Sequence, residues 1–172
     1  MYVGVNRTNR VCPFYIRKEE ALDTNTAVMA ELGYSSERIG EQGTGNAMAA
    51  ILTTLLYLKE HHQSVEEWVA FLGRSYAPGW ENLRGKGAKA FARMAALNFV
   101  SVGANLLSLA GNETHAELTA TWPSQEWLDF VGVSKGDSDA FCGVFGPIAE
   151  HLGLHYEWHR DGEQIRLKFT AH

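Results

Sequence analysis

The chain has 172 residues, enough for one domain to bury a sizeable hydrophobic core without disulfide bonds. Its formal net charge is -5 and its Lys and Arg residues form no cluster, which argues against nucleic acid or an anionic membrane as a partner. Its two cysteines, Cys12 and Cys142, form no CxxC or Cys/His pattern and so favour a reducing compartment. Because it has no secretory leader and no long uncharged apolar run, we expect a single soluble, cytoplasmic domain over residues 1–172.

The first segment, residues 2–16, is apolar and aromatic, and Pro13 denies it a continuous helix. We therefore expect an extended arm or an edge strand there. Residues 18–32 carry apolar side chains at helical spacing, and Gly33 follows them directly. Since glycine commonly terminates helices, the pattern predicts a helix that ends at Gly33.

Three glycines, Gly40, Gly43 and Gly45, precede an apolar stretch at residues 47–61. Glycines before a helix can let backbone N–H groups approach a phosphate. Here no clear strand precedes the glycines and no Lys-Ser/Thr pair follows them, unlike in nucleotide-binding loops. We interpret the segment as a flexible loop leading into a buried helix over residues 47–61, and we expect no cofactor.

Ser64 and Glu67 form the S-x-x-E pattern of a capping box, which predicts a short helix ending near Gly73. Further along, apolar side chains recur at helical spacing over residues 86–109 and predict a long central helix. Gly103 lies inside that range, where a glycine costs about 1 kcal/mol relative to alanine. We interpret it as a site of close packing.

Residues 115–122 alternate between apolar and polar side chains, which predicts a strand with Trp122 on its buried face. Ser124 is a suitable N-cap for a short helix. Asp137 could cap another helix over residues 138–151, where an internal proline should kink it or restart it.

Two alternating runs, residues 154–160 and 163–169, flank Asp161-Gly162, a dipeptide that favours a two-residue turn. Folding about that turn gives a hairpin with one apolar and one polar face. The predicted cross-strand pairs are Leu154 with Phe169, Tyr156 with Leu167, Trp158 with Ile165, and Glu157 with Arg166. We expect an α+β fold in which helices pack on one face of a small antiparallel sheet.

The polar face of this hairpin carries His155, Glu157 and His159 at every second position. Two imidazoles spaced in this way on a strand can bind one metal ion. The predicted register places Lys168 and Arg166 opposite this group, and their positive charges would oppose a divalent cation. We therefore expect no metal site.

Two runs in the last third of the chain carry a family resemblance: A-E-L-T-A-T-W-P-S-Q-E-W-L-D-F-V-G-V and D-A-F-C-G-V-F-G-P-I-A-E-H-L-G-L-H-Y-E-W-H-R-D-G-E-Q-I-R-L-K-F. They resemble the C-terminal half of the L-2-amino-thiazoline-4-carboxylic acid hydrolase-like proteins. They are also similar to the wider vinyl-reductase ligand-binding fold, in which helices back a small sheet and enclose an apolar cavity. Sensory domains of that type carry metal-binding cysteines in the hairpin and the preceding helix, whereas this chain has only Cys142 there.

The resemblance implies two functions. The first is an enzyme, a hydrolase or lyase, acting on a compact ring substrate in an internal cavity; for it we expect Cys142, Glu41 and Tyr76 as catalytic residues. The second is a non-catalytic domain of vinyl-reductase type that holds an apolar small molecule or forms a homodimer. Cys142 tests the first, because a thiol nucleophile needs an environment that stabilises its thiolate, whereas its apolar neighbours favour burial in the core.

We expect the ligand between the helices at residues 47–61 and 86–109 and the inner face of the strand at 115–122, where apolar side chains are densest. In a continuous helix, Asn98, Ser101 and Asn105 would share one stripe. That stripe would face either solvent or a cavity, and we favour the cavity. The expected ligand-binding residues are Asn46, Arg74, Asn98, Ser101, Asn105 and Trp122.

Overall fold

The computed structural model describes residue 29 and residues 31–171, so the predicted arm at residues 2–16 lies outside the described residues. The chain divides into two compact units, Met1–Glu41 and Gln42–His172. The expectation of a single domain over all 172 residues stays a prediction.

In the first unit, Met29 and Glu31 are helical and Gly33 has a φ of +81°. The N–H of Tyr34 donates to the carbonyl oxygen of Met29 at 2.9 Å, the closing bond of a Schellman motif. The predicted helix end at Gly33 is therefore confirmed, while most of residues 18–32 lie outside the described residues.

Helix α2 (Ser36–Glu60) begins earlier than predicted, because the Ser35 hydroxyl accepts a hydrogen bond from the Arg38 N–H at 3.1 Å and caps it. The predicted glycine loop is wrong, since all of its glycines lie inside this helix: Gly40, Gly43 and Gly45. Interior glycines cost about 1 kcal/mol each but do not forbid a helix. The helix N-terminus that a phosphate-binding loop would need therefore does not exist at residue 46.

Burial on α2 is confined to one face, whose buried residues are Met48, Leu52 and Leu55, whereas Tyr57 is exposed. The expectation of a helix buried all round is therefore wrong.

The capping box is confirmed at the start of α3 (Val65–Tyr76), where the Ser64 hydroxyl accepts from the Glu67 N–H at 3.1 Å. The helix continues past Gly73, and a 3₁₀ helix η1 (Ala77–Leu83) follows it. Gly73 serves close packing rather than helix termination, because a Cβ there would lie 2.5 Å from the carbonyl oxygen of Val144.

Helix α4 (Gly87–Ser101) is shorter than the helix predicted over residues 86–109. Gly103 has a φ of +86° and ends it, since the Gly103 and Ala104 N–H groups donate to the carbonyls of Val100 and Phe99 at 3.0 and 3.1 Å. The glycine that we interpreted as an interior packing site is thus the helix terminator. The residues after it form the strand β1 (Asn105–Gly111).

The sheet contains β1, β2 (His115–Thr121), β3 (Leu154–Asp161) and β4 (Gln164–Ala171) in the order β1-β2-β4-β3, with every neighbouring pair antiparallel. The alternation predicted for residues 115–122 is confirmed. Its inner face is buried and consists of Ala116, Leu118, Ala120 and Trp122.

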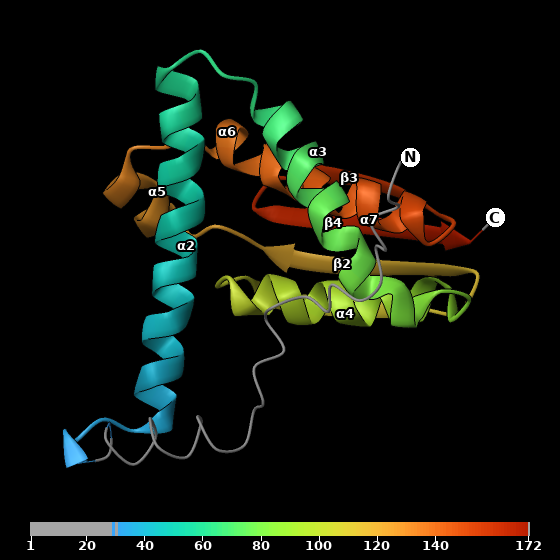
Figure 1. Cartoon of the computed structure of the whole chain (residues 1–172), viewed down its shortest axis with the longest axis horizontal. Helices are drawn as coiled ribbons and strands as arrows, with labels where there is room; N and C mark the ends of the chain where they lie inside the picture. Colours follow the sequence, from blue (N-terminus) through green and yellow to red (C-terminus); the bar gives the residue numbers. More distant parts are fainter. Residues whose placement is uncertain (1–28, 30, 172) are drawn as a thin grey trace, which may run out of the picture. The chain divides into compact units, whose positions relative to one another are not determined.

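Helices pack on one face of this sheet, which confirms the predicted α+β class (Figure 1). Helix α4 packs on β1, β2 and β4. Helix α7 (Phe145–His151) packs on β3 and also contacts α3. The opposite face is polar, as expected for an antiparallel sheet that meets water on one side.

Between β2 and β3 the chain forms α5 (Gln125–Val131), α6 (Lys135–Asp139) and the 3₁₀ helix η2 (Ala140–Val144). Ser124 caps α5 as predicted. The cap of α6 is Ser134 and not Asp137, because the Ser134 hydroxyl accepts from the Asp137 N–H at 3.2 Å. The predicted helix over residues 138–151 is broken by η2 before α7 begins.

The C-terminal hairpin forms, but its predicted register is wrong by two residues. Gly162-Glu163 is the turn, and Asp161 pairs with Gln164. Gly162 has a φ of +59° whereas Glu163 does not adopt a positive φ, the combination of a type II′ turn with glycine in its first central position. The observed pairs include Tyr156 with Phe169, Trp158 with Leu167, and Glu157 with Lys168. Because the shift is an even number of residues, the apolar and polar faces stay as predicted.

Candidate functional site

The predicted nucleophile Cys142 is completely buried in η2. Burial raises the pKa of its thiol far above the usual range, and the negative charge of Asp139 raises it further. The main-chain carbonyl oxygen of Cys142 accepts a hydrogen bond from the Tyr156 hydroxyl at 2.7 Å. The thiol is therefore held in its protonated form inside the core, which does not suit a nucleophile.

The other two predicted catalytic residues are exposed. Glu41 belongs to the first unit and forms an ion pair with Arg38 at 3.1 Å. Tyr76 is the last residue of α3 in the second unit. Within the described part of the second unit, no hydrogen bond joins Cys142 to Tyr76.

The predicted polar stripe does not exist, because α4 ends before Asn105 and that residue begins β1. Asn98 and Ser101 are exposed on α4 and bond to its own backbone: Asn98 donates to the Met94 carbonyl at 2.9 Å, and Ser101 donates to the Asn98 carbonyl at 2.7 Å. Asn105 is exposed as well. These amides and this hydroxyl face solvent, not an internal cavity.

Three predicted ligand-binding residues remain. Asn46 is exposed and accepts from Gln42 at 2.9 Å, and Arg74 is exposed on α3. Trp122 is buried, and its indole N–H donates to the Val102 carbonyl at 2.9 Å. Its ring lies 5.6 Å from the ring of Phe99, so aromatic side chains fill the space between α4 and β2 at this point.

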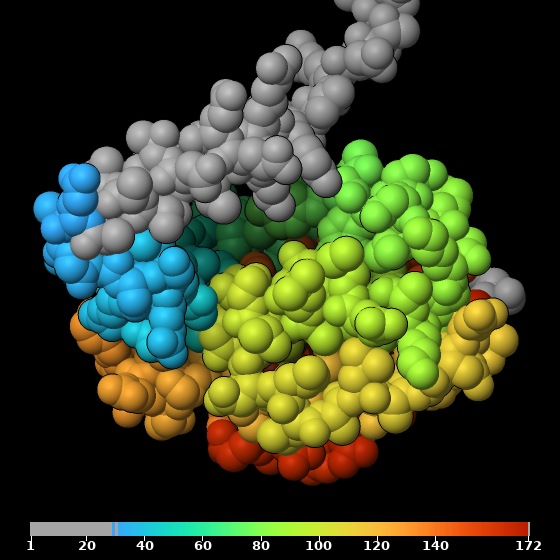
Figure 2. All heavy atoms as spheres, turned by 90° about the horizontal axis from the view of Figure 1, so that it is seen from below, coloured from blue at the N-terminus to red at the C-terminus, as the bar shows by residue number. Residues whose placement is uncertain are grey.

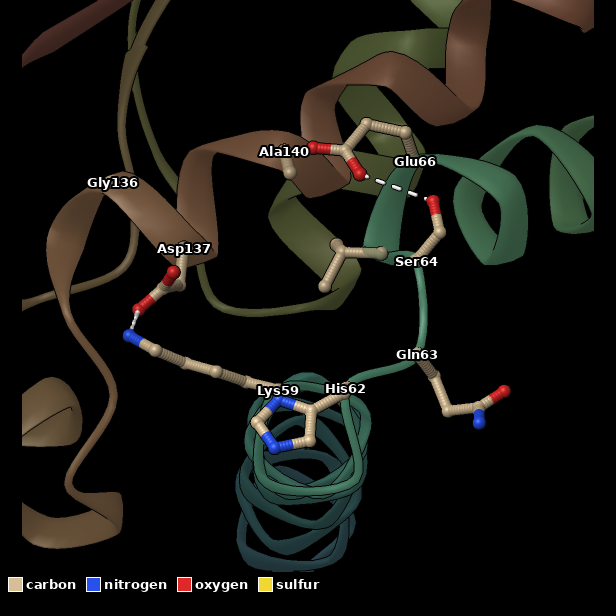
Figure 3. Close-up of a pocket in the computed structure, with 9 residues that line it drawn as sticks. Lys59, His62, Gln63, Ser64, Glu66, Gly136, Asp137 and Ala140 are labelled. Carbon is tan, nitrogen blue, oxygen red and sulfur yellow. Dashed lines mark hydrogen bonds and ion pairs between the residues drawn. The ribbon is translucent and has the colours of Figure 1, made fainter.

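A hollow of about 430 Å³ that we did not predict from the sequence lies between the α2–α3 connection and α6 (Figure 3). Polar and charged side chains line it from both sides: Lys59, His62, Gln63, Ser64, Glu66 and Asp137. Its only sequence signal is the polar run H-H-Q-S between two helices.

The carboxylates around this hollow are already paired. Lys59 donates to Asp137, which also accepts from Ser134, and these bonds lower the pKa of Asp137. Ser64 donates to Glu66 at 3.2 Å, as Figure 3 shows. The described residues contain no group of three or more His, Cys, Asp or Glu that could hold a metal ion. The Lys59–Asp137 ion pair therefore links α2 to α6. Both carboxylates that line the hollow already accept hydrogen bonds, so neither is free for acid–base chemistry.

His62 lines the hollow with a φ of 53°, a region that favours glycine. It occupies the left-handed position that ends α2, where the Gln63 N–H donates to the Leu58 carbonyl at 2.8 Å. Helix termination accounts for this conformation.

A second feature is an exposed apolar surface, which we name the α4–β1 surface. Its large apolar side chains are Leu97 (63% exposed), Val100 (45%), Leu106 (44%) and Leu107 (51%). Figure 2 shows α4 and β1 side by side on one face, in yellow-green and yellow. We did not predict this surface, because the sequence pattern placed Leu106 and Leu107 in a helix.

Strand β1 lies at an edge of the sheet, and its sequence N-L-L-S-L-A-G contains no charged residue. Each of the other three strands of the described sheet carries at least one charged residue. Exposed edge strands are usually protected by charges, because their unpaired backbone groups can bind another strand. On β1 the feature that disfavours pairing with another strand is an irregularity in the β1–β2 register between Leu106 and Ser108.

No helix among the described residues has both the length and the apolar character needed to cross a membrane. Comparison with known proteins finds no matching family model and no matching curated protein.

Proposed function

We propose that this chain is a non-catalytic interaction domain that forms a homodimer through the α4–β1 surface. The observation that carries the proposal is the exposure of large apolar side chains beside an uncharged edge strand: Leu97, Val100, Leu106 and Leu107. These side chains lie on two elements that pack against each other, and removing exposed apolar side chains from water favours association.

The enzyme expected from the family resemblance stays a prediction, with no specific observation in its favour. Its nucleophile would be Cys142, whose buried thiol has a raised pKa. Its substrate would need the space that the rings of Phe99 and Trp122 occupy. The alternative of a dimerising domain requires neither a reactive thiol nor an internal cavity.

Charge on α4 gives the proposed dimer a distinctive salt dependence. Lys89 and Arg93 lie four residues apart, and Val100 follows Arg93 by seven, so all three share one stripe of the helix. In a two-fold dimer each copy presents the same basic side chains to the other. Salt screens this repulsion, so the dimer should become tighter as ionic strength rises.

A Leu107→Lys variant tests the proposal. A lysine on the edge strand adds charge and removes apolar contact, so sedimentation equilibrium should show a dissociation constant raised by at least about tenfold, equivalent to about 1.4 kcal/mol. The matched control is Phe71→Lys on α3, where the phenylalanine is 60% exposed and lies outside the α4–β1 surface.

The control should dimerise like the unmodified protein. If Leu107→Lys and Phe71→Lys associate with equal strength, or if Phe71→Lys alone weakens the dimer, the interface lies elsewhere. Circular dichroism of each variant checks that the fold is kept.

A further inference from the structure

The hydrogen-bonding direction of β1 can be read from its connection to β2. The Asn112 N–H donates to the His115 carbonyl at 2.7 Å, so the backbone of Asn112 points toward β2. Residues of an antiparallel pair alternate between pointing at the partner strand and pointing away from it. The N–H and C=O groups of Ala110 and Ser108 therefore face β2, whereas those of Leu109 and Gly111 face outward.

The two edges of the sheet differ in charge. The outer edge formed by β3 carries the exposed carboxylates Glu157 and Asp161, which disfavour pairing with another strand. On β1 the outward backbone groups of Leu109 and Gly111 lie in a strand without any charge. Pairing β1 with a second β1 therefore brings no like charges together along the strands.

Resting on the proposed function, we propose that two copies of this chain join their β1 strands antiparallel across a two-fold axis at Leu109, forming one continuous sheet. The Leu109 N–H of each copy donates to the Leu109 carbonyl of the other. In this register Leu107 lies opposite Gly111 of the second copy, and Ser108 lies opposite Ala110 of the second copy.

The shape of the paired side chains and the symmetry of the contact favour a second copy of this chain as the partner of β1. The bulky Leu107, at the irregular point of β1, meets a glycine, whose lack of a side chain leaves room for it. A β1–β1 contact is isologous and closes as a dimer, whereas a β1–β3 contact would be heterologous and would extend into a fibre. The charges on β3 act against that second arrangement.

A double variant, Ser108→Cys with Ala110→Cys, tests the register in a Cys12→Ser background, in which the buried Cys142 is the one native cysteine left in the sequence. In a non-hydrogen-bonded antiparallel pair the Cα atoms are about 4.5 Å apart, within the roughly 4.4–6.8 Å that a disulfide bond spans. Both wild-type side chains are exposed. Mild oxidation should give a covalent dimer on a non-reducing gel, and reduction should reverse it.

The two single-cysteine variants are the controls, because each places its thiol opposite a residue without one. Efficient cross-linking by Ser108→Cys alone would mean an axis at Ser108 and would overturn the proposed register, as would cross-linking by Ala110→Cys alone. A chain that sediments as a dimer but fails to cross-link as the double variant contradicts this inference and leaves the homodimer standing. A chain that is monomeric at all concentrations contradicts both.

Discussion

Arg160 and Asp139 form a largely buried ion pair that joins the end of β3 to the end of α6. The guanidinium Nε donates to a carboxylate oxygen at 2.6 Å, and the side chains are 14% and 12% exposed. The same guanidinium donates to the main-chain carbonyls of Trp122 and Glu163 at 2.9 and 3.2 Å. One side chain thus ties together α6, the hairpin turn and the segment that follows β2.

Replacing Asp139 with alanine should lower the free energy of unfolding by about 3 kcal/mol, because it leaves the Arg160 guanidinium enclosed without its counter-charge. The control is Glu163→Gln, which removes the ion pair between Lys135 and a highly exposed Glu163 and should cost less than about 1 kcal/mol. Urea unfolding followed by tryptophan fluorescence measures both. Equal losses for the two variants would mean that the Arg160–Asp139 pair is not the dominant clamp.

The Cys142 thiol should be unreactive in the folded protein, because burial raises its pKa and excludes the reagent. In the Cys12→Ser variant, a colorimetric thiol assay at pH 8 should detect no rapid reaction under native conditions. The same protein unfolded in guanidinium chloride should react promptly. Rapid modification of the folded variant would mean that Cys142 is accessible, and the enzyme hypothesis would regain its nucleophile.

Two glycine substitutions should change stability in opposite directions. Gly43 lies inside α2 with open space around it, so Gly43→Ala should raise the free energy of unfolding by roughly 1 kcal/mol. Gly103 has a left-handed φ, and a Cβ there would lie 2.6 Å from the Met48 methyl group, so Gly103→Ala should destabilise the protein by more than about 1 kcal/mol. Chemical denaturation decides the signs. A destabilising Gly43→Ala would restore the loop that we predicted from the sequence.

The Glu81 carboxylate should give the protein a salt-bridge contribution that is lost in acid. A hydrogen bond from Arg84 lowers the pKa of Glu81 from 4.5 to about 2, with a further contribution from His151. A lowered folded-state pKa stabilises the fold above the unfolded value and loses that effect as the pH falls through the folded value. The difference in stability between the wild type and Glu81→Gln should therefore shrink as the pH falls from about 4.5 toward about 2. A difference that stays constant over this range would contradict the Glu81–Arg84 contact.

Short sequence patterns correctly predicted the features that depend on residues close together in the chain, namely helix caps and the alternation of a strand. Ser64 and Ser124 cap their helices as expected, and the alternation around Leu118 placed β2 correctly. Errors arose where one residue admits two readings. Gly103 ends a helix instead of lying inside one. Because we extended the helix past Gly103, we did not predict β1 and wrongly placed Asn105 on a helical stripe with Asn98 and Ser101. The hairpin register depended on whether the glycine takes the first or the second central position of the turn, which the dipeptide Asp161-Gly162 does not determine.

The features of the candidate site could not be predicted, because they depend on contacts between elements distant in sequence and on which side chains those contacts leave exposed. Whether Cys142 meets solvent is decided by the elements packed around η2, such as α3. The hollow near Lys59 and Asp137 arises because α6 returns to the end of α2. Exposure of Leu106 and Leu107 follows from the order of the described strands, in which β1 pairs with β2 and lies at the edge.

The molecular mass of the unmodified chain in solution, measured by light scattering over a range of concentrations, tests the proposed homodimer most directly. One chain has a mass of 19.1 kDa. We expect the mass to rise to twice this value as the concentration increases, and to do so at lower concentrations when salt is added. A mass of one chain at every concentration up to the millimolar range, with or without salt, would contradict it.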